Sequence, residues 1–319
     1  MGFMLHGEWQ DEWYSHDEKG EFQREETVFH DFISPDDLDF SPEPNRYHLY
    51  VSWACPWASR VLLTWKLKGL EDVIGLSVVD PYMGAEGWEF SEREGCIPDS
   101  VNGADYLQEI YLLADADYTG RVTVPVLWDK KEETIVNNQS DEIMRMLDLQ
   151  FDSWAKNEVT FYPGEKREEI DRTIAELYKP VNNGVYRAGF AGSQQAYEQA
   201  VEDLFAALDR WEEVLSSQRY LCGDRLTEAD FCLFTTLYRF DSVYYLHFKC
   251  NLRRLVDFPN LWGYTRDIYQ TPGVAEVCNM DHVKEHYYRS HEHINPKQII
   301  PTGPRLDFNA PHDRAAVGD

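Results

Sequence analysis

The order of the sequence patterns predicts two domains, an α/β domain followed by an all-α domain. Two observations carry this prediction. Short β-prone runs alternate with helical patterns over residues 46–150, and the hydrophobic spacing becomes purely helical over residues 160–290. A chain of 319 residues with 43% apolar content is also long enough to fill two cores.

The α/β domain begins with a strand, a turn and a helix. Residues 47–51 are β-prone and end just before Cys55. From Pro56 onward, apolar residues recur with the three- and four-residue spacing of one helix face, and Gly69 is a typical helix end. The pattern therefore places Cys55 at the N-terminus of a helix.

The following elements complete the domain. Residues 73–79 predict a second buried strand, and a helix is predicted in the insertion after it, around YLQEIYLLADA. Residues 121–129 and 133–138 then predict two strands joined by a charged turn, and a last helix begins near Ser140. Strand, helix, strand, inserted helix, hairpin and terminal helix is the order of a thioredoxin-like unit.

The all-α domain contains one long amphipathic pattern and one strong helix-start signal. Apolar residues recur three and four apart over residues 197–215. Thr227 is the predicted N-cap of a later helix, with Asp230 in the capping-box position. The flanking segments are polar and interrupted by proline, so we expect residues 1–45 to form an arm and residues 291–319 an extended tail.

The strongly acidic composition excludes several classes of partner. The chain has 57 Asp and Glu against 30 Lys and Arg, a formal net charge of −27. Nucleic acid and anionic membranes are poor partners for such a surface. We find no signal peptide and no apolar stretch of the ~18 residues that a membrane span needs, and we expect a cytoplasmic protein. The acid excess is typical of a salt-loving source, with an ordinary acidic cytosolic protein as the alternative.

Six cysteines occur, at positions 55, 96, 222, 232, 250 and 278, without a C-x-x-C pair. We expect five of them to be reduced structural thiols and Cys55 to be a nucleophile, the alternative being a buried inert cysteine. At a helix N-terminus the pKa of a thiol falls below the ~8.5 of free cysteine, because unpaired N–H groups stabilise the thiolate. Ala58 stands where a redox partner would be, so Cys55 must exchange with an external thiol.

The dipeptide Val124-Pro125 lies inside a predicted strand, where proline removes a hydrogen-bond donor. A cis bond at this point would turn the backbone of Val124 towards the start of the Cys55 helix. Its N–H and C=O would then be open to an extended peptide. Because only ~5–6% of X-Pro bonds are cis, the dipeptide by itself leaves the isomer undecided.

Several ordered motifs between about residues 20 and 300 carry a resemblance to a known family. They are G-x-F-x-R, S-W-A-C-P-W-A-S-R, R-V-T-V-P-V-L-W-D, N-N-x-S, N-N-G-V-Y-x-x-G-F-A, R-F-D-x-V-Y-x-x-H-F-K and H-Y-Y-x-S-H-x-x-I-N-P. Together they resemble the Xi-class glutathione transferases, the glutathionyl-hydroquinone reductases. The resemblance implies the two-domain glutathione transferase fold, and we expect a homodimer.

The resemblance also implies a reaction, the removal of glutathione from the ring of a glutathionyl-hydroquinone. Cys55 would attack the sulfur of the conjugate, and a second thiol would resolve the mixed disulfide. Tyr186 would protonate the leaving aromatic, while Tyr244 and Tyr287 would hydrogen-bond the sulfur of Cys55 and lower its pKa. The residues implied to hold the thiol tripeptide are Trp88, Arg121, Val122, Thr123, Val124, Gln139 and Ser140.

One position departs from the family pattern, which has glutamate where this chain has Gln139. A neutral amide then faces the amino group of the substrate. Glutathione is the expected co-substrate, and γ-glutamylcysteine or another small thiol is the alternative.

Other functions stay open from the residues alone. Omega-type thiol transferases and dehydroascorbate reductases use the same fold and thiolate, and a transferase-like module can bind ligands without catalysis. Because cations are scarce, Arg24, Arg121 and Arg187 are candidate carboxylate anchors, with surface roles as the alternative. The histidines at 286, 291 and 293 do not share one helix face, so we expect no metal site.

Overall fold

The structure is a computed structural model and describes residues 2–317. The chain forms two compact units, each with its own core. The first contains residues 2–14, Arg24–Val159 and Val277–Ile299, and the second contains Ser15–Gln23, Thr160–Glu276 and residues 300–317.

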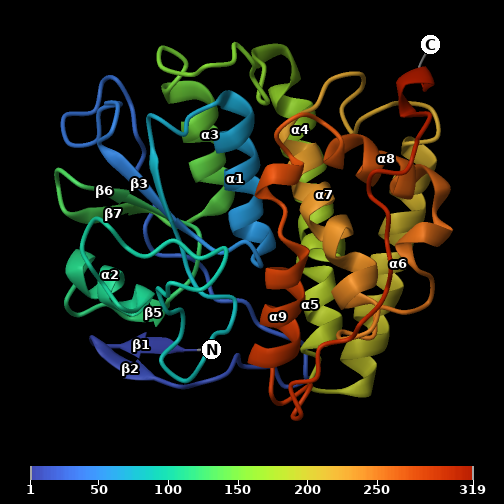
Figure 1. Ribbon diagram of the computed structural model, residues 1–319. Coiled ribbons are helices and arrows are strands. Elements are labelled where there is room, and N and C mark those ends of the chain that lie inside the picture. Colours follow the sequence, from blue (N-terminus) through green and yellow to red (C-terminus); the bar gives the residue numbers. More distant parts are fainter. Residues whose placement is uncertain (1, 318–319) are drawn as a thin grey trace. The chain divides into compact units, whose positions relative to one another are not determined.

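A four-stranded sheet of order β4-β3-β6-β7 forms the centre of the first unit (Figure 1). The strands are β3 (Tyr47–Val51), β4 (Gly75–Val78), β6 (Val126–Asp129) and β7 (Thr134–Asn137). β3 is parallel to β4 and antiparallel to β6, and β6 is antiparallel to β7. This mixed sheet confirms the predicted thioredoxin-like domain. The segment 122–125, which the sequence pattern joined to β6, lies outside the strand.

Three helices pack on this sheet. In Figure 1, α1 (Pro56–Lys68) and α3 (Ser140–Gln150) lie side by side on one face, and α2 (Leu107–Ala114) lies on the other. Helix α1 begins at Pro56, and Gly69 caps its C-terminal end, as predicted. Gly69 adopts a φ of 70°, and its N–H donates to the carbonyl of Lys66. Local chemistry sets both ends, since proline suits a first helical turn and glycine accepts a left-handed conformation at no steric cost.

The arm contains strands that the sequence analysis did not predict. β1 (Phe3–Leu5) and β2 (Glu8–Gln10) form a hairpin, and β1 also pairs with β5 (Gly120–Arg121). Farther along the arm, His30 forms an antiparallel bridge with Asn137 at the outer edge of β7. Two- and three-residue strands are too short to give a periodic signal, so only pairing reveals them.

The second unit is helical. Its helices are α4 (Arg167–Leu177), α5 (Gly184–Gly189), α6 (Gln194–Val214), α7 (Glu228–Arg239) and α8 (Pro259–Tyr269), coloured from yellow-green to orange in Figure 1. Single π turns, Tyr178–Asn182 and Phe240–Tyr244, follow α4 and α7. Short 3₁₀ turns span Gly164–Lys166, Leu255–Asp257, Ala275–Val277 and Arg314–Ala316. Within residues 2–317 no helix has the length and apolar character needed to cross a bilayer.

The start of α7 is the predicted capping box. Asp230 is fully buried and accepts hydrogen bonds from the N–H groups of Thr227 (2.8 Å) and Leu221 (2.9 Å). The hydroxyl groups of Thr227 and Tyr264 also donate to it, each at 2.9 Å. One carboxylate therefore connects a loop, the helix start and α8.

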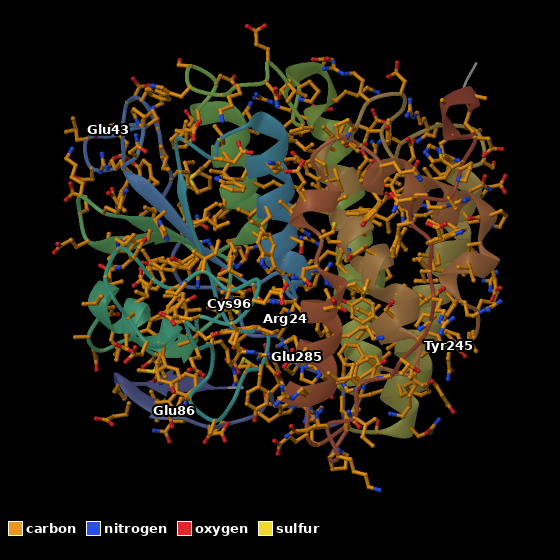
Figure 2. The ribbon with its side chains drawn as sticks, in the orientation of Figure 1. Arg24, Glu43, Glu86, Cys96, Tyr245 and Glu285 are labelled. Atoms are coloured by element: carbon orange, nitrogen blue, oxygen red, sulfur yellow. The ribbon has the colours of Figure 1, made fainter. Side chains whose placement is uncertain are left out.

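Helix α9 (Met280–Ser290) packs in the first unit, although the sequence pattern grouped it with the all-α domain. Glu285, labelled in Figure 2, accepts a hydrogen bond from Arg93 at 2.8 Å. The N–H of Met83 donates to the hydroxyl of Ser290 at 2.9 Å. Helical spacing identifies a helix, but these long-range contacts decide which core it joins.

The tail beyond Ile300 is extended and lies along the second unit. Gln270 of α8 donates to the carbonyls of Phe308 (2.8 Å) and Ala310 (2.9 Å). Arg314 is buried and donates to the carbonyl of Leu215 at 2.6 Å. The tail is thus held by side chains that bind its backbone and by one buried cation of its own.

The imidazole of His48 is buried in the centre of the sheet. Only 3% of the residue is exposed, and its Nε2 lies 2.8 Å from the hydroxyl of Ser77. Because that hydroxyl donates to the carbonyl of Pro98 (3.1 Å), His48 must donate from Nε2. Burial lowers the pKa of His48 to about 4.

This burial predicts a loss of stability in mild acid. The unfolded chain protonates His48 near its ordinary pKa of 6.5, whereas the folded chain does so only near 4. The stabilisation is therefore complete above pH 6.5 and is lost as the pH falls towards 4. Between pH 7 and pH 5 we expect His48 to cost about 2 kcal/mol of unfolding free energy.

The measurement is urea unfolding at pH 7, 6 and 5 for the wild type and for His48→Gln. The glutamine amide can still donate to Ser77 but does not titrate, so the variant should lose about 2 kcal/mol less than the wild type over this range. If the free energy of unfolding depended equally on pH in the two proteins, His48 would not be the group that causes the loss of stability.

Candidate active site

Cys55 immediately precedes α1 and is half-buried. Its backbone is extended, and its carbonyl accepts hydrogen bonds from the N–H and the hydroxyl of Ser59, both at 2.9 Å. Pro56 occupies the first helical position, as the sequence predicted. The side chain thus lies at the positive end of the α1 dipole, which stabilises a thiolate when it forms.

The backbone of Val124 lies beside this sulfur. The Val124-Pro125 peptide bond is cis, and Sγ of Cys55 donates to the carbonyl of Val124 at 3.5 Å. No acceptor within the described part of the chain takes the N–H of Val124. The structure therefore decides the isomer that the sequence left open, and it leaves a backbone donor available to an extended ligand.

The start of α3 carries two of the predicted thiol-binding residues. Ser140 is the first helical residue and only 4% exposed, yet its hydroxyl has no hydrogen-bond partner within residues 2–317. The side chain of Gln139 is held by Thr27, whose hydroxyl donates to Oε1 at 3.0 Å. A buried hydroxyl beside open helix N–H groups can bind a carboxylate.

An aromatic cluster in the first unit contains two further predicted residues. Trp88 stacks on His286 of α9, with ring centroids 4.8 Å apart. Tyr287 follows in α9, is 2% exposed and lies 5.4 Å from the ring of His291. Trp13 of the arm contacts His291 edge to face at 5.6 Å. The arm therefore adds a tryptophan to this cluster that the sequence analysis did not identify.

Arg121 is buried, and its guanidinium binds the arm. It donates to both carboxylate oxygens of Glu25, at 2.9 and 3.1 Å, and to the carbonyls of Glu12 (2.6 Å) and Trp13 (3.0 Å). It also lies 4.7 Å above the ring of Tyr14. The side chain of Arg121 thus anchors the arm.

Tyr14 is another arm residue of this region that no sequence motif indicated. Burial raises its pKa, Arg24 and Arg121 oppose that shift, and the negative charges of Glu25 and Cys55 reinforce it. Arg24, labelled in Figure 2, lies 5.1 Å above the ring of Trp57, two residues after Cys55. The arm therefore brings a phenol and a cation to the neighbourhood of α1.

Two predicted tyrosines come together in the second unit. Tyr186 of α5 and Tyr244 of the π turn after α7 are buried, with ring centroids 6.0 Å apart. Both also lie 5.5 Å from the ring of Phe248. The structure places Cys55 and Tyr287 in the first unit and this pair in the second.

Comparison with known proteins identifies the family. The domain described as "Glutathione S-transferase, N-terminal domain" matches residues 54–150, and its C-terminal counterpart matches residues 194–267. The solved structure of a Xi-class glutathione transferase from Natrialba magadii is 53% identical, covers 99% of this chain and 97% of its own, and superposes with a TM-score of 0.94. The chain belongs to the Xi class of the glutathione transferases.

Two relatives of this Xi-class chain have names that state an activity. Glutathionyl-hydroquinone reductase PcpF of Sphingobium chlorophenolicum is 50% identical over 95% of this chain and 96% of its own. Glutathionyl-hydroquinone reductase YqjG of Escherichia coli is 48% identical over 98% of both chains. A glutathione-bound structure of YqjG superposes with a TM-score of 0.91, covering 98% of this chain and 99% of that one at 46% identity.

The structure also shows the surroundings of Arg187, of the cysteines and of the potential metal ligands. Arg187 is buried and pairs with Glu21 (2.8 Å) and Asp203 (3.0 Å), so the surface alternative considered for it is wrong. None of the six cysteines forms a disulfide; Cys222, Cys232 and Cys250 are buried, whereas Cys96 and Cys278 are half-buried. Residues 2–317 contain no group of three potential metal ligands close enough to hold an ion.

Proposed function

We propose that this Xi-class chain is a glutathionyl-hydroquinone reductase with Cys55 as its nucleophile. The observation that carries the proposal is the position of the Cys55 sulfur, at the start of α1 and 3.5 Å from the carbonyl of Val124. Ala58 occupies the position of a resolving cysteine, so the adduct must be released by a second thiol molecule. Identity of 50% and 48% to two proteins of this name supports the same reaction.

The reaction has two steps. The Cys55 thiolate attacks the sulfur of the conjugate, so that a disulfide bond forms to the glutathionyl group and the carbon–sulfur bond to the ring breaks. Tyr186 supplies the proton that the ring takes up, and hydroquinone leaves. A second glutathione thiolate then attacks the mixed disulfide, releasing glutathione disulfide and the Cys55 thiolate. The thioether sulfur of the conjugate and the sulfur of the second glutathione are oxidised to the disulfide, and the ring is reduced by two electrons.

The remaining site residues hold the thiol and the sulfur. The N–H and C=O of Val124 pair with the peptide backbone of the thiol, the hydroxyl of Ser140 takes a carboxylate, and Trp88 provides a flat face. Tyr244 and Tyr287 donate to the sulfur of Cys55. Glutathione is the proposed co-substrate, and γ-glutamylcysteine is the alternative.

We also propose a cellular compartment, a type of source organism and an oligomeric state for the enzyme. Six cysteines without a disulfide are typical of a reducing compartment, which favours the cytoplasm. The net charge of −27 favours a salt-loving source. We also propose a homodimer, which size-exclusion chromatography with light scattering tests directly.

Product analysis tests the proposed reaction. A glutathionyl-hydroquinone is incubated with the enzyme and glutathione, in low and in molar salt, and the products are separated by chromatography. We expect one hydroquinone and one glutathione disulfide per conjugate consumed. Faster turnover of dehydroascorbate would favour an omega-type thiol transferase, and turnover of neither substrate would favour a binding module.

A further inference from the structure

A polar pocket lies in the first unit beside β4, the edge strand of the four-stranded sheet. Its volume is about 500 Å³, within the ~300–1,000 Å³ range of small-molecule sites. His48 lies near the start of β3, whereas Cys55 lies beyond the other end of that strand, so the pocket is not part of the candidate active site. The polar side chains that line it are those of His48, Ser100, Asn102, Lys130 and Glu133.

His48 gives this pocket a buried hydrogen-bond acceptor. Its Nε2 donates to Ser77, and burial lowers the pKa of the ring to about 4, so at neutral pH Nδ1 carries a lone pair and no proton. Nδ1 has no hydrogen-bond partner within residues 2–317. An acceptor that is buried without a donor costs free energy, which a ligand N–H can recover.

The glycine beside His48 leaves room for such a ligand. Gly75 of β4 pairs with His48 in the parallel register, and a Cβ atom at Gly75 would lie 2.5 Å from Nδ1. Outside residues 74–76, the three heavy atoms nearest to that point all belong to the imidazole ring, at 2.5, 3.1 and 3.6 Å. Because both residues line the pocket, the space in front of Nδ1 is open to a ligand atom.

Two opposite charges from one turn also line the pocket. Lys130 and Glu133 begin and end the turn between β6 and β7, and neither side chain forms an ion pair in the part of the chain that the structure describes. The two residues between them, Lys131 and Glu132, form ion pairs with the arm at 3.3 and 3.8 Å. The outer two charges are therefore available to a ligand, the lysine to a carboxylate and the glutamate to an ammonium group.

The lining groups together fit a ligand that has both charges and an N–H group. We infer that the pocket binds a free α-amino acid, whose ammonium donates to Nδ1 of His48 and faces Glu133, and whose carboxylate faces Lys130. A simple anion would leave the buried acceptor without a donor, and a quaternary ammonium has no N–H to give it. The inference is independent of the proposed function, because it uses no group of the candidate active site.

A nuclear magnetic resonance titration of the full chain with isotopically labelled histidine nitrogens tests the inference. The ligands are L-alanine, N,N,N-trimethyl-L-alanine, which keeps both charges without an N–H, and propionate, which lacks the ammonium. L-alanine should move the Nδ1 resonance of His48 in the direction of a protonated nitrogen. It should also bind about tenfold more tightly than either of the other ligands, because only it satisfies the buried acceptor.

Variants of the ring and of the turn locate the binding site. His48→Gln keeps a donor at the position of Nε2 but removes the acceptor, and should raise the Kd for L-alanine about tenfold. Lys130→Gln and Glu133→Gln should each raise it about threefold, because each removes one exposed charge. Lys131→Gln and Glu132→Gln are matched controls from the same turn and should bind L-alanine as the wild type does. Thermal unfolding verifies that each variant is folded.

Three results would overturn the inference. The Nδ1 resonance of His48 does not move with L-alanine, propionate or the trimethyl derivative binds as tightly as L-alanine, or the two control variants weaken binding as much as Lys130→Gln and Glu133→Gln do. If His48→Gln is unfolded, the affinities for the three ligands and the variants of the turn still decide the question, because the turn variants change only exposed side chains.

Discussion

Replacing Cys55 with serine is expected to lower kcat/KM for a glutathionyl-hydroquinone about a thousandfold or more. A serine hydroxyl is not ionised near neutral pH, and it cannot form the mixed disulfide through which the conjugate is reduced. The sulfur lies at the start of α1 beside Val124, and no other cysteine occupies this turn. The initial rate of hydroquinone release is the measurement.

Matched controls are available for this experiment. Cys96 and Cys278 are also reduced and half-buried, so Cys96→Ser and Cys278→Ser test whether any accessible thiol matters. Both should keep kcat/KM within about twofold of the wild type, because neither is the N-cap residue of a helix as Cys55 is. If Cys55→Ser retained the wild-type rate, the protein would be neither a glutathionyl-hydroquinone reductase nor an omega-type thiol transferase that uses this thiolate.

Replacing Asp230 with alanine is expected to lower the free energy of unfolding by about 4 kcal/mol, which ranks among the larger effects of single substitutions. The carboxylate is fully buried and accepts hydrogen bonds from Thr227, Leu221 and Tyr264. Alanine leaves these donors buried without an acceptor and removes the helix cap. Urea unfolding followed by far-UV circular dichroism measures the change.

Two variants define the cause of this loss. Asp230→Asn keeps one acceptor oxygen and should fall between the wild type and Asp230→Ala. Asp209 forms an exposed ion pair with Arg253, so Asp209→Ala should leave the free energy of unfolding nearly unchanged. An Asp230→Ala protein as stable as Asp209→Ala would show that the capping box does not stabilise the second unit.

Elements with local signals at their ends were predictable. Residues 47–51 form β3 as expected, and α1 lies between Pro56 and Gly69 because each of these residues restricts its own backbone. The start of α7 was equally clear, since Thr227 and Asp230 interact across a single turn. In each case the deciding interactions lie within a few residues of the chain.

Some residues of the candidate site could not be predicted from the spacing of residues along the chain. Trp13 and Tyr14 approach the aromatic cluster and Arg121 only because β1 pairs with β5 and Arg121 binds the arm. The side-chain amide of Gln139 at the start of α3 is bound by Thr27, which lies more than a hundred residues earlier in the chain. Spacing along the chain does not encode such contacts.

The amino-acid sequence by itself determined the two-part architecture, the position of Cys55 at a helix start and, through its motifs, the family. These features depend on hydrophobic periodicity and on residues that restrict their own backbone. Only the tertiary structure decided the cis bond before Pro125, the membership of α9 in the first unit and the engagement of Arg121 by the arm. The physical reason is that each of these depends on contacts between segments distant in the chain, whose free energies appear only once the units have packed.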